Sequence, residues 1–176
     1  DDAKAHYNLG NAYFESGKHK ESIEPYKQAI RIDPDYTNAH NNLGVAYRKL
    51  GKYEEAIESY KQAIRIDPDF AWAHYNLGNA YGELGKYQEA IKSYKQAIRI
   101  DPDDADAHDN LGTAYGELGR HEEAIKSHKQ AIRIDPDDAE SHYNLGNAYG
   151  ELGKYQEAIK SYKQAIRIDP DDADAH

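Results

Sequence analysis

The chain has 176 residues and contains no cysteine, and nowhere does it hold a long apolar run. Without cysteine there is no disulfide and no thiolate metal site. Without a long apolar run there is no membrane span and no core of a signal peptide. The sequence therefore predicts a protein that does not contact the membrane, and the absence of cysteine favours a reducing, cytoplasmic location.

Basic charge is also scarce, because 22 Lys and Arg stand against 32 Asp and Glu and leave a net charge of −10. Binding to nucleic acid needs a basic face that displaces counterions, so we expect no nucleic-acid partner. Among the aromatic residues, 2 Phe and 1 Trp accompany 16 Tyr. Tyrosine combines an apolar ring with a polar tip, which suits half-buried positions and surfaces that face a partner.

One stretch, His74–His108, returns letter for letter as His142–His176, and a looser copy starts at His108. The chain is thus built from a unit of 34 residues. Repetition at such a period predicts a stack of units whose core runs along its length. We expect one array over residues 1–176, with repeats at 3–36, 37–70, 71–104, 105–138 and 139–172, and with residues 173–176 beginning a further helix.

Each unit shows two helical patterns. In the second unit, small and apolar residues at helical spacing are followed by Gly51, which we expect to end the first helix at positive φ. A second pattern runs from Tyr53 to Ile66, and Pro68 ends it because proline cannot continue a helix. The short linkers predict antiparallel neighbours. In the later units, first helices are preceded by residues that we expect to be N-caps, namely Asp104, Asp138 and Asp172.

The first unit departs from this pattern, since Pro25 stands inside its second helix. An interior proline costs about 3 kcal/mol, and terminal repeats are often atypical. We therefore expect the first unit to be strained or frayed.

These units resemble the tetratricopeptide repeat (TPR). The third reads His74-x2-Leu77-Gly78-x2-Tyr81, then Ala90-x3-Tyr94, Ala97 and Pro102, with His in place of the usual first aromatic residue. The resemblance covers essentially the whole chain, and its repeats look most like the superhelical TPR arm of O-GlcNAc transferase. It implies an all-α fold: a right-handed TPR superhelix (α-solenoid) of five helix-turn-helix repeats plus the start of a sixth, with the first helices lining a concave groove.

No motif predicts catalysis. The GELGK segments lack the Ser or Thr of a phosphate loop, and neither HExxH nor GxSxG occurs. The DPDDAD linkers resemble the start of a calcium loop, which needs an amide or carboxylate at its fifth position and a glycine at its sixth. Here Ala105 and Asp106 occupy these two positions, so the match fails. We therefore expect no enzyme, no cofactor and no catalytic residue.

Histidines raise the question of a metal site. One recurs per unit, at His6, His40, His74, His108, His142 and His176. Neighbouring repeats lie about 10 Å apart, too far to share an ion, so we expect half-buried packing residues with a hydrogen-bond partner. The fourth unit adds His121 and His128 at positions where other units have Tyr. They lie about 10.5 Å apart along a helix, so we expect no metal, although their titration can make stability depend on pH.

An asparagine recurs two residues after this histidine, at Asn8, Asn42, Asn76, Asn110 and Asn144. The resemblance places this asparagine ladder in the concave groove. Because an amide both donates and accepts hydrogen bonds, the ladder predicts a grip on an extended peptide backbone. The alternative is that asparagine serves the fold at this position.

Side chains beside the ladder are rich in Tyr and Asn. The resemblance assigns to the groove Tyr7, Tyr75, Tyr143, Asn11, Asn79, Asn147 and Trp72. This lining, together with nearby acids, predicts a polar or basic partner segment on which Tyr and Trp72 stack; the alternative is an ordinary solvated face. TPR domains that bind chaperone tails use Lys and Arg at places held here by Tyr7, Trp72 and Asn76. We therefore expect no chaperone-tail carboxylate clamp.

These observations predict a non-enzymatic scaffold for protein–protein interaction that binds an extended peptide. Two alternatives stay open. Solenoid ends expose apolar faces, so the chain can self-associate head to tail. It can also be the regulatory or substrate-recruiting arm of a larger enzyme.

Overall fold

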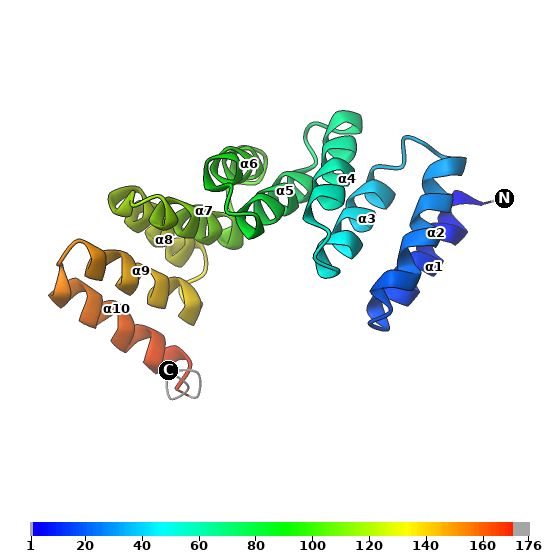
Figure 1. The fold of residues 1–176 in the computed structure, drawn as a ribbon. Coiled ribbons are helices and arrows are strands. Elements are labelled where there is room, and N and C mark those ends of the chain that lie inside the picture. The colour runs from blue at the N-terminus through cyan, green and yellow to red at the C-terminus, as the bar shows by residue number, and fades with distance from the viewer. Residues whose placement is uncertain (1, 171–176) are drawn as a thin grey trace. The chain divides into compact units, whose positions relative to one another are not determined.

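The computed structural model describes residues 2–170, and within them every regular element is an α-helix. Figure 1 shows these helices following one another along the chain. Their bounds are α1 Ala3–Glu15, α2 His19–Ile32, α3 Thr37–Lys49, α4 Tyr53–Ile66, α5 Ala71–Glu83, α6 Tyr87–Ile100, α7 Ala105–Glu117, α8 His121–Ile134, α9 Ala139–Glu151 and α10 Tyr155–Ile168. None of the helices in the described residues is long and apolar enough to cross a membrane. The prediction of an all-α array of helical repeats is confirmed.

Glycine ends the first helix of each repeat, as the sequence predicts. Gly51 has φ 71°, its N–H donates to the Arg48 carbonyl at 3.0 Å, and the N–H of Lys52 donates to the Tyr47 carbonyl at 3.0 Å. This pair of bonds satisfies carbonyls that have no partner within the helix, and it needs a left-handed residue at position 51. The turn between the two helices is therefore encoded locally.

Aspartate starts the later first helices. The backbone N–H of Ala107 donates to the Asp104 side chain at 3.0 Å. The Asp138 carboxylate accepts from the N–H groups of Glu140 and Ser141 at 3.2 and 3.0 Å. Both N-cap predictions are confirmed, whereas Asp172, like residues 173–176, lies outside the described residues.

Pro25 does not break the first repeat. Helix α2 runs without interruption from His19 to Ile32 through the proline, contrary to the expected fraying. Pro25 and Tyr26 are both buried, and the hydroxyl of Ser22 donates to the His19 carbonyl at 2.8 Å. The buried face therefore holds the helix together although one backbone hydrogen bond is missing.

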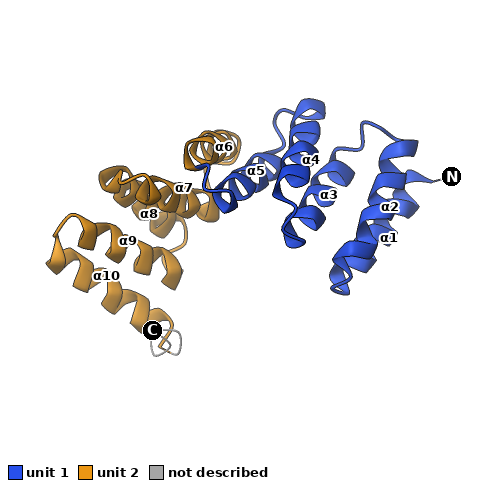
Figure 2. Cartoon of the chain, viewed as in Figure 1, with its two compact units in different colours: residues 1–86 blue, residues 87–176 orange. Residues whose placement is uncertain are grey.

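The chain divides into two compact units, coloured separately in Figure 2. Unit 1 spans Asp1–Lys86 with α1 to α5, and unit 2 spans Tyr87–His176 with α6 to α10. In unit 1, α2 packs against both α1 and α3, and in unit 2, α8 packs against both α7 and α9. Neighbouring first helices are in contact: α1 contacts α3, and α7 contacts α9. Among the described residues, neighbouring second helices are not in contact, neither α2 with α4 nor α8 with α10. Within each unit the first helices therefore lie on the inner side of the curve.

A glycine of the first helix packs against an aromatic ring of the second helix. A Cβ atom on Gly44 would lie 2.6 Å from Cε1 of Tyr60, whose side chain is fully buried. Tyr60 also packs with Leu77 and Ala80 of the next first helix. Glycine at this position therefore lets the two helices of the repeat approach closely, with the ring of the second helix lying against the backbone of the first.

Candidate functional site

Four of the recurrent histidines are structural. Their Nε2 atoms each lie within hydrogen-bond distance of the carbonyl oxygen of the proline six residues earlier: His40 and His74 at 2.9 Å, and His108 and His142 at 3.1 Å. All four are half-buried. Within residues 2–170 no three His, Asp or Glu side chains gather closely enough to hold a metal ion. These four histidines fix the linker to the helix that follows it.

The asparagine ladder connects successive first helices. In three repeats the Nδ2 group of the ladder residue donates to the side chain 35 residues earlier. These bonds run from Asn42 to Tyr7 (3.1 Å), from Asn76 to Asn41 (3.2 Å) and from Asn144 to Asp109 (2.8 Å). Asn8 is exposed, Asn110 is half-buried and Asn76 is buried. Part of the hydrogen-bonding capacity of the ladder is therefore used inside the protein.

In unit 1 several of the expected groove residues come together. Asn42 Nδ2 also donates to Asn11 Oδ1 at 3.0 Å, and the Tyr26 hydroxyl donates to the same oxygen at 2.8 Å. Asn11, Tyr26 and Asn42 line a pocket of about 190 Å³, with Phe14, Glu15 and Val45. The polar groups here mostly bond to one another, and Phe14 occupies part of the available space.

Aromatic residues of the predicted groove are more accessible. The Trp72 side chain is 62% exposed and makes an edge-to-face contact with Tyr75, with ring centroids 6.1 Å apart. Tyr143 is 47% exposed, and its ring centroid lies 5.7 Å from that of Tyr162. The Tyr162 hydroxyl donates to Oδ1 of Asn147 at 2.8 Å. These rings offer apolar area on the first-helix side, while Asn79 is half-buried beside the ladder.

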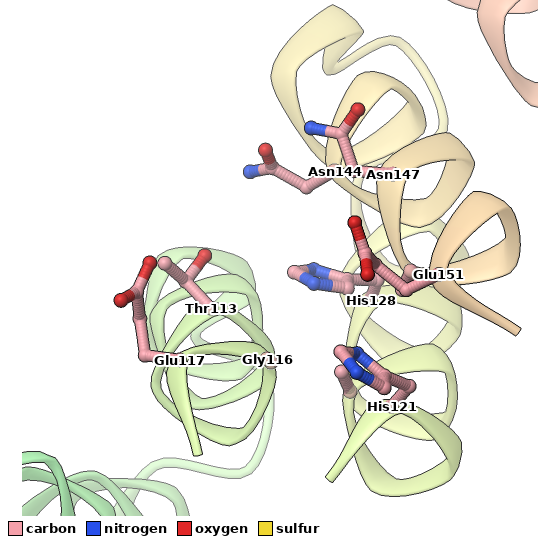
Figure 3. A pocket seen from close by; sticks show the side chains of 11 residues that line it. Thr113, Gly116, Glu117, His121, His128, Asn144, Asn147 and Glu151 are labelled. Carbon is pink, nitrogen blue, oxygen red and sulfur yellow. The ribbon is translucent and has the colours of Figure 1, made fainter. Parts of the chain in front are cut away.

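A larger pocket, of about 440 Å³, lies in unit 2 between α7, α8 and α9. Figure 3 shows side chains from all three helices around it. Helix α7 contributes Thr113, Gly116 and Glu117, and α8 contributes His121 and His128. From α9 come Asn144, Asn147 and Glu151. Two of these, Asn144 and Asn147, belong to the predicted groove set, and Glu117 and Glu151 are among the nearby acids expected beside it.

A buried, hydrogen-bonded pair of residues lies beneath this pocket. Nδ1 of His128 is 2.6 Å from Oδ1 of Asp109, and the two residues are 2% and 7% exposed. Asp109 also accepts hydrogen bonds from Asn144 and from the hydroxyl of Ser141. Burial raises the pKa of the Asp109 carboxyl, but the hydrogen bond and charge of His128, with the bonds from Asn144 and Ser141, outweigh it and lower the pKa. The carboxylate is therefore ionised, and Nδ1 of His128 carries a proton toward it.

Three smaller side chains explain why this pocket exceeds its counterpart in unit 1. The positions of Asn11, Phe14 and Tyr26 are held in the fourth repeat by Thr113, Gly116 and His128. A Cβ atom on Gly116 would meet nothing within 4 Å. Relative to the first repeat, the fourth repeat thus loses side-chain volume at one place.

Sequence reasoning treated His128 only as a source of pH dependence and did not pair it with Asp109. A signal was present, because three departures from the repeat pattern meet in one network. Asp109 stands where other units have Tyr or Asn, His128 where they have Tyr, and Ser141 where they have Ala. Joint departures of this kind indicate contact, but only the packing of α7, α8 and α9 shows which residues meet.

Comparisons with known proteins agree with this architecture. The family described as "Cilia and flagella-associated protein 70 C-terminal domain", a TPR domain, matches residues 2–176. No curated protein matches the chain. Among solved structures, the crystal structure of MamA is 31% identical with a TM-score of 0.87, and the match covers 94% of this chain and 97% of that one.

Two further structures share the fold at lower identity. MamA from Desulfovibrio magneticus RS-1 (residue 41 to the end) is 22% identical with a TM-score of 0.90, covering 97% of this chain and 96% of that one. YrrB, described as a TPR protein with an unusual peptide-binding site, is 24% identical with a TM-score of 0.81, covering 97% and 88%. The repeat grammar, the helix pairs and the match over residues 2–176 lead to one conclusion: the chain belongs to the tetratricopeptide-repeat family of the cilia and flagella-associated protein 70 C-terminal domain.

Proposed function

We propose that this chain is a non-enzymatic scaffold that binds an extended peptide of a partner protein along the first helices of its repeats. TPR arrays are protein-interaction scaffolds, and YrrB, of the same fold, is described as having a peptide-binding site. The observation that carries the proposal is the inner side of each unit, where exposed aromatic rings lie beside side-chain amides. Trp72 and Tyr143 supply the most exposed rings of this set.

The ladder retains capacity for a peptide backbone. Asn76 and Asn144 each use Nδ2 toward the preceding repeat. A side-chain amide has two N–H donors and an acceptor oxygen. When one N–H bonds to another residue of the protein, the second N–H and the oxygen stay available for a peptide. Asn42 differs, because its Nδ2 has two acceptors and its oxygen accepts from Asn41 at 3.2 Å. We therefore assign peptide binding to Asn76 and Asn144 ahead of Asn42.

The partner segment is polar or basic on this proposal. The chain carries a net charge of −10, which repels acidic segments and attracts basic ones. Exposed Tyr and Trp rings stack on Arg or Lys side chains. The likeness to the arm of O-GlcNAc transferase, and with it a role as the recruiting arm of a larger enzyme, stays a prediction.

The test is capture of the partner from the native source with a chain that carries both Asn76→Ala and Asn110→Ala. We expect weaker capture with an unchanged helical content, because the removed amides contact the peptide. Asn42→Ala is the matched control, since its amide is satisfied within unit 1 and its loss should affect stability more than capture. Equal capture by the wild type and the Asn76→Ala, Asn110→Ala chain would show that the ladder serves only the fold.

A second candidate function is head-to-tail self-association, which rests on two unpartnered faces. Ile159 of α10 is 46% exposed, whereas the equivalent Ile125 of α8, a helix that packs against α9, is 9% exposed. Leu9 of α1 is 46% exposed, whereas the equivalent Leu43 is 7% exposed against α2. The two faces are the halves of an interface that recurs within the chain, so one copy can cover another in a contact that propagates. Sedimentation over a range of concentrations tests this, and a constant monomer mass would exclude it.

A further inference from the structure

The floor of the pocket between α7, α8 and α9 is a histidine with one nitrogen in use. His128 is 2% exposed and its Nδ1 is held by Asp109. Among the described residues, Nε2 has no hydrogen-bond partner, and Figure 3 shows the imidazole directed into the pocket. Because Nδ1 points to the Asp109 carboxylate, Nε2 is the ring nitrogen that faces whatever enters the pocket, and without a proton it accepts a hydrogen bond. The buried pair thus sets the orientation of an acceptor at the base of an open pocket.

The walls of the pocket carry acceptors and negative charge. Glu117 on α7 and Glu151 on α9 lie on different sides of it, and Asn144 and Asn147 add amide oxygens. The Tyr87 hydroxyl donates to Glu117, and this bond raises the pKa of Tyr87. Among the described residues, no lysine or arginine lines the pocket. With Glu117 and Glu151 on its walls, the site favours a positively charged, hydrogen-bond-donating group.

We propose that this pocket is a specificity subsite that takes an arginine side chain of the bound peptide. The proposal rests on the function proposed above and names one position at which the peptide is read. A guanidinium group has five N–H donors in a plane, which match acceptors that lie in several directions, whereas an ammonium group is a compact point charge. Gly116 and Thr113 leave the room that Phe14 and Asn11 take away in the first repeat. Only the fourth repeat combines Thr113, Gly116 and His128 at these positions, so we assign the selection to it.

The direct test uses a nine-residue Gly/Ser peptide with one central arginine, titrated into the full chain at neutral pH and followed by NMR. We expect shifts in the backbone amides of α7 and α9 and in the His128 ring. A matched peptide with citrulline keeps the shape but loses the charge and should bind about tenfold more weakly, as expected for one charge-assisted bond. Equal binding of the arginine and citrulline peptides would overturn the proposal.

A filling variant separates the pocket from the rest of the fold. Gly116→Phe introduces the residue of the first repeat into the pocket, and its Cβ meets open space, so the helix should keep its stability. We expect loss of arginine-peptide binding. Gly150→Phe is the matched control, the same change one repeat later at a glycine that does not line the pocket. Wild-type binding by Gly116→Phe would overturn the proposal.

Charge variants complete the test. Glu151→Gln removes one wall charge and should weaken arginine-peptide binding several-fold, whereas Glu122→Gln removes an exposed charge outside the pocket and should not. One outcome overturns the subsite alone: the ladder asparagines are needed for partner capture, but neither Gly116→Phe nor the citrulline peptide changes peptide binding. A chain that captures no partner, with or without the Asn variants, overturns the proposed function as well.

Discussion

The surroundings of a single glycine decide whether adding a methyl group helps or harms. Gly44 faces the ring of Tyr60 at 2.6 Å from where a Cβ would lie, and that ring is fully buried. Gly116, in the same kind of helix, faces open space. We predict that Gly44→Ala destabilises by about 1–3 kcal/mol, because overpacking outweighs the better helix propensity. Gly116→Ala should stabilise by up to about 1 kcal/mol. Urea unfolding measures both, and equal effects of one sign would contradict the packing argument.

The Asp109 carboxylate makes stability depend on acid. Its pKa is lowered in the folded protein, so its contribution is present above the unfolded value, about 3.9, and is lost as pH falls through the lower folded value. We predict that Asp109→Asn lowers the free energy of unfolding at neutral pH, and that its difference from wild type shrinks below about pH 4. Chemical unfolding across this pH range measures it. Glu122→Gln, at an exposed site, should show no such convergence.

At the scale of one helix, the N-cap of α9 is the simplest element to test. The Asp138 carboxylate accepts from two backbone N–H groups. We predict that Asp138→Ala costs about 0.5–2 kcal/mol, because both donors lose their side-chain partner. Asp137→Ala is the control, since only its backbone N–H is engaged in the linker, with Asp135 at 3.1 Å. Thermal unfolding measures the stability of both variants. A comparable loss of stability in Asp138→Ala and Asp137→Ala would mean that the charge of the linker, and not the N-cap, causes the effect.

Helix positions were predictable because their signals are local. Glycine at positive φ, aspartate before the first turn and proline in the linker act within a few residues, and each repeats along the chain. Pro25 was misjudged because its effect is decided by tertiary packing: the buried face of α2 holds the helix through it. The Asp109–His128 pair was missed for the same reason, since 19 residues and a turn separate its members.

Over the whole molecule, identical sequences occupy unequal surroundings. Helices α6 and α10 share every residue, yet Ile91 is 6% exposed and the equivalent Ile159 is 46% exposed. We predict that backbone amides of α10 exchange with solvent faster than the same amides of α6, because packing contributes more than propensity to helix stability. Native-state hydrogen exchange at low protein concentration measures this. Equal protection would mean that the local sequence alone sets helix stability here.

The repetition that defines the chain also makes its parts interchangeable. Residues 142–176 copy 74–108, and the small and apolar positions of most repeats match, so during folding a second helix meets several first helices that fit it almost equally well. Apolar contacts therefore do little to choose the correct pairing, and misassembly between similar repeats is a known hazard. The Asp109–His128–Ser141 network is made of residues that occur once at their positions, so a shifted pairing would leave Asp109 buried without its donors. This network thus favours the correct packing of α7, α8 and α9 over packing between the helices of other repeats.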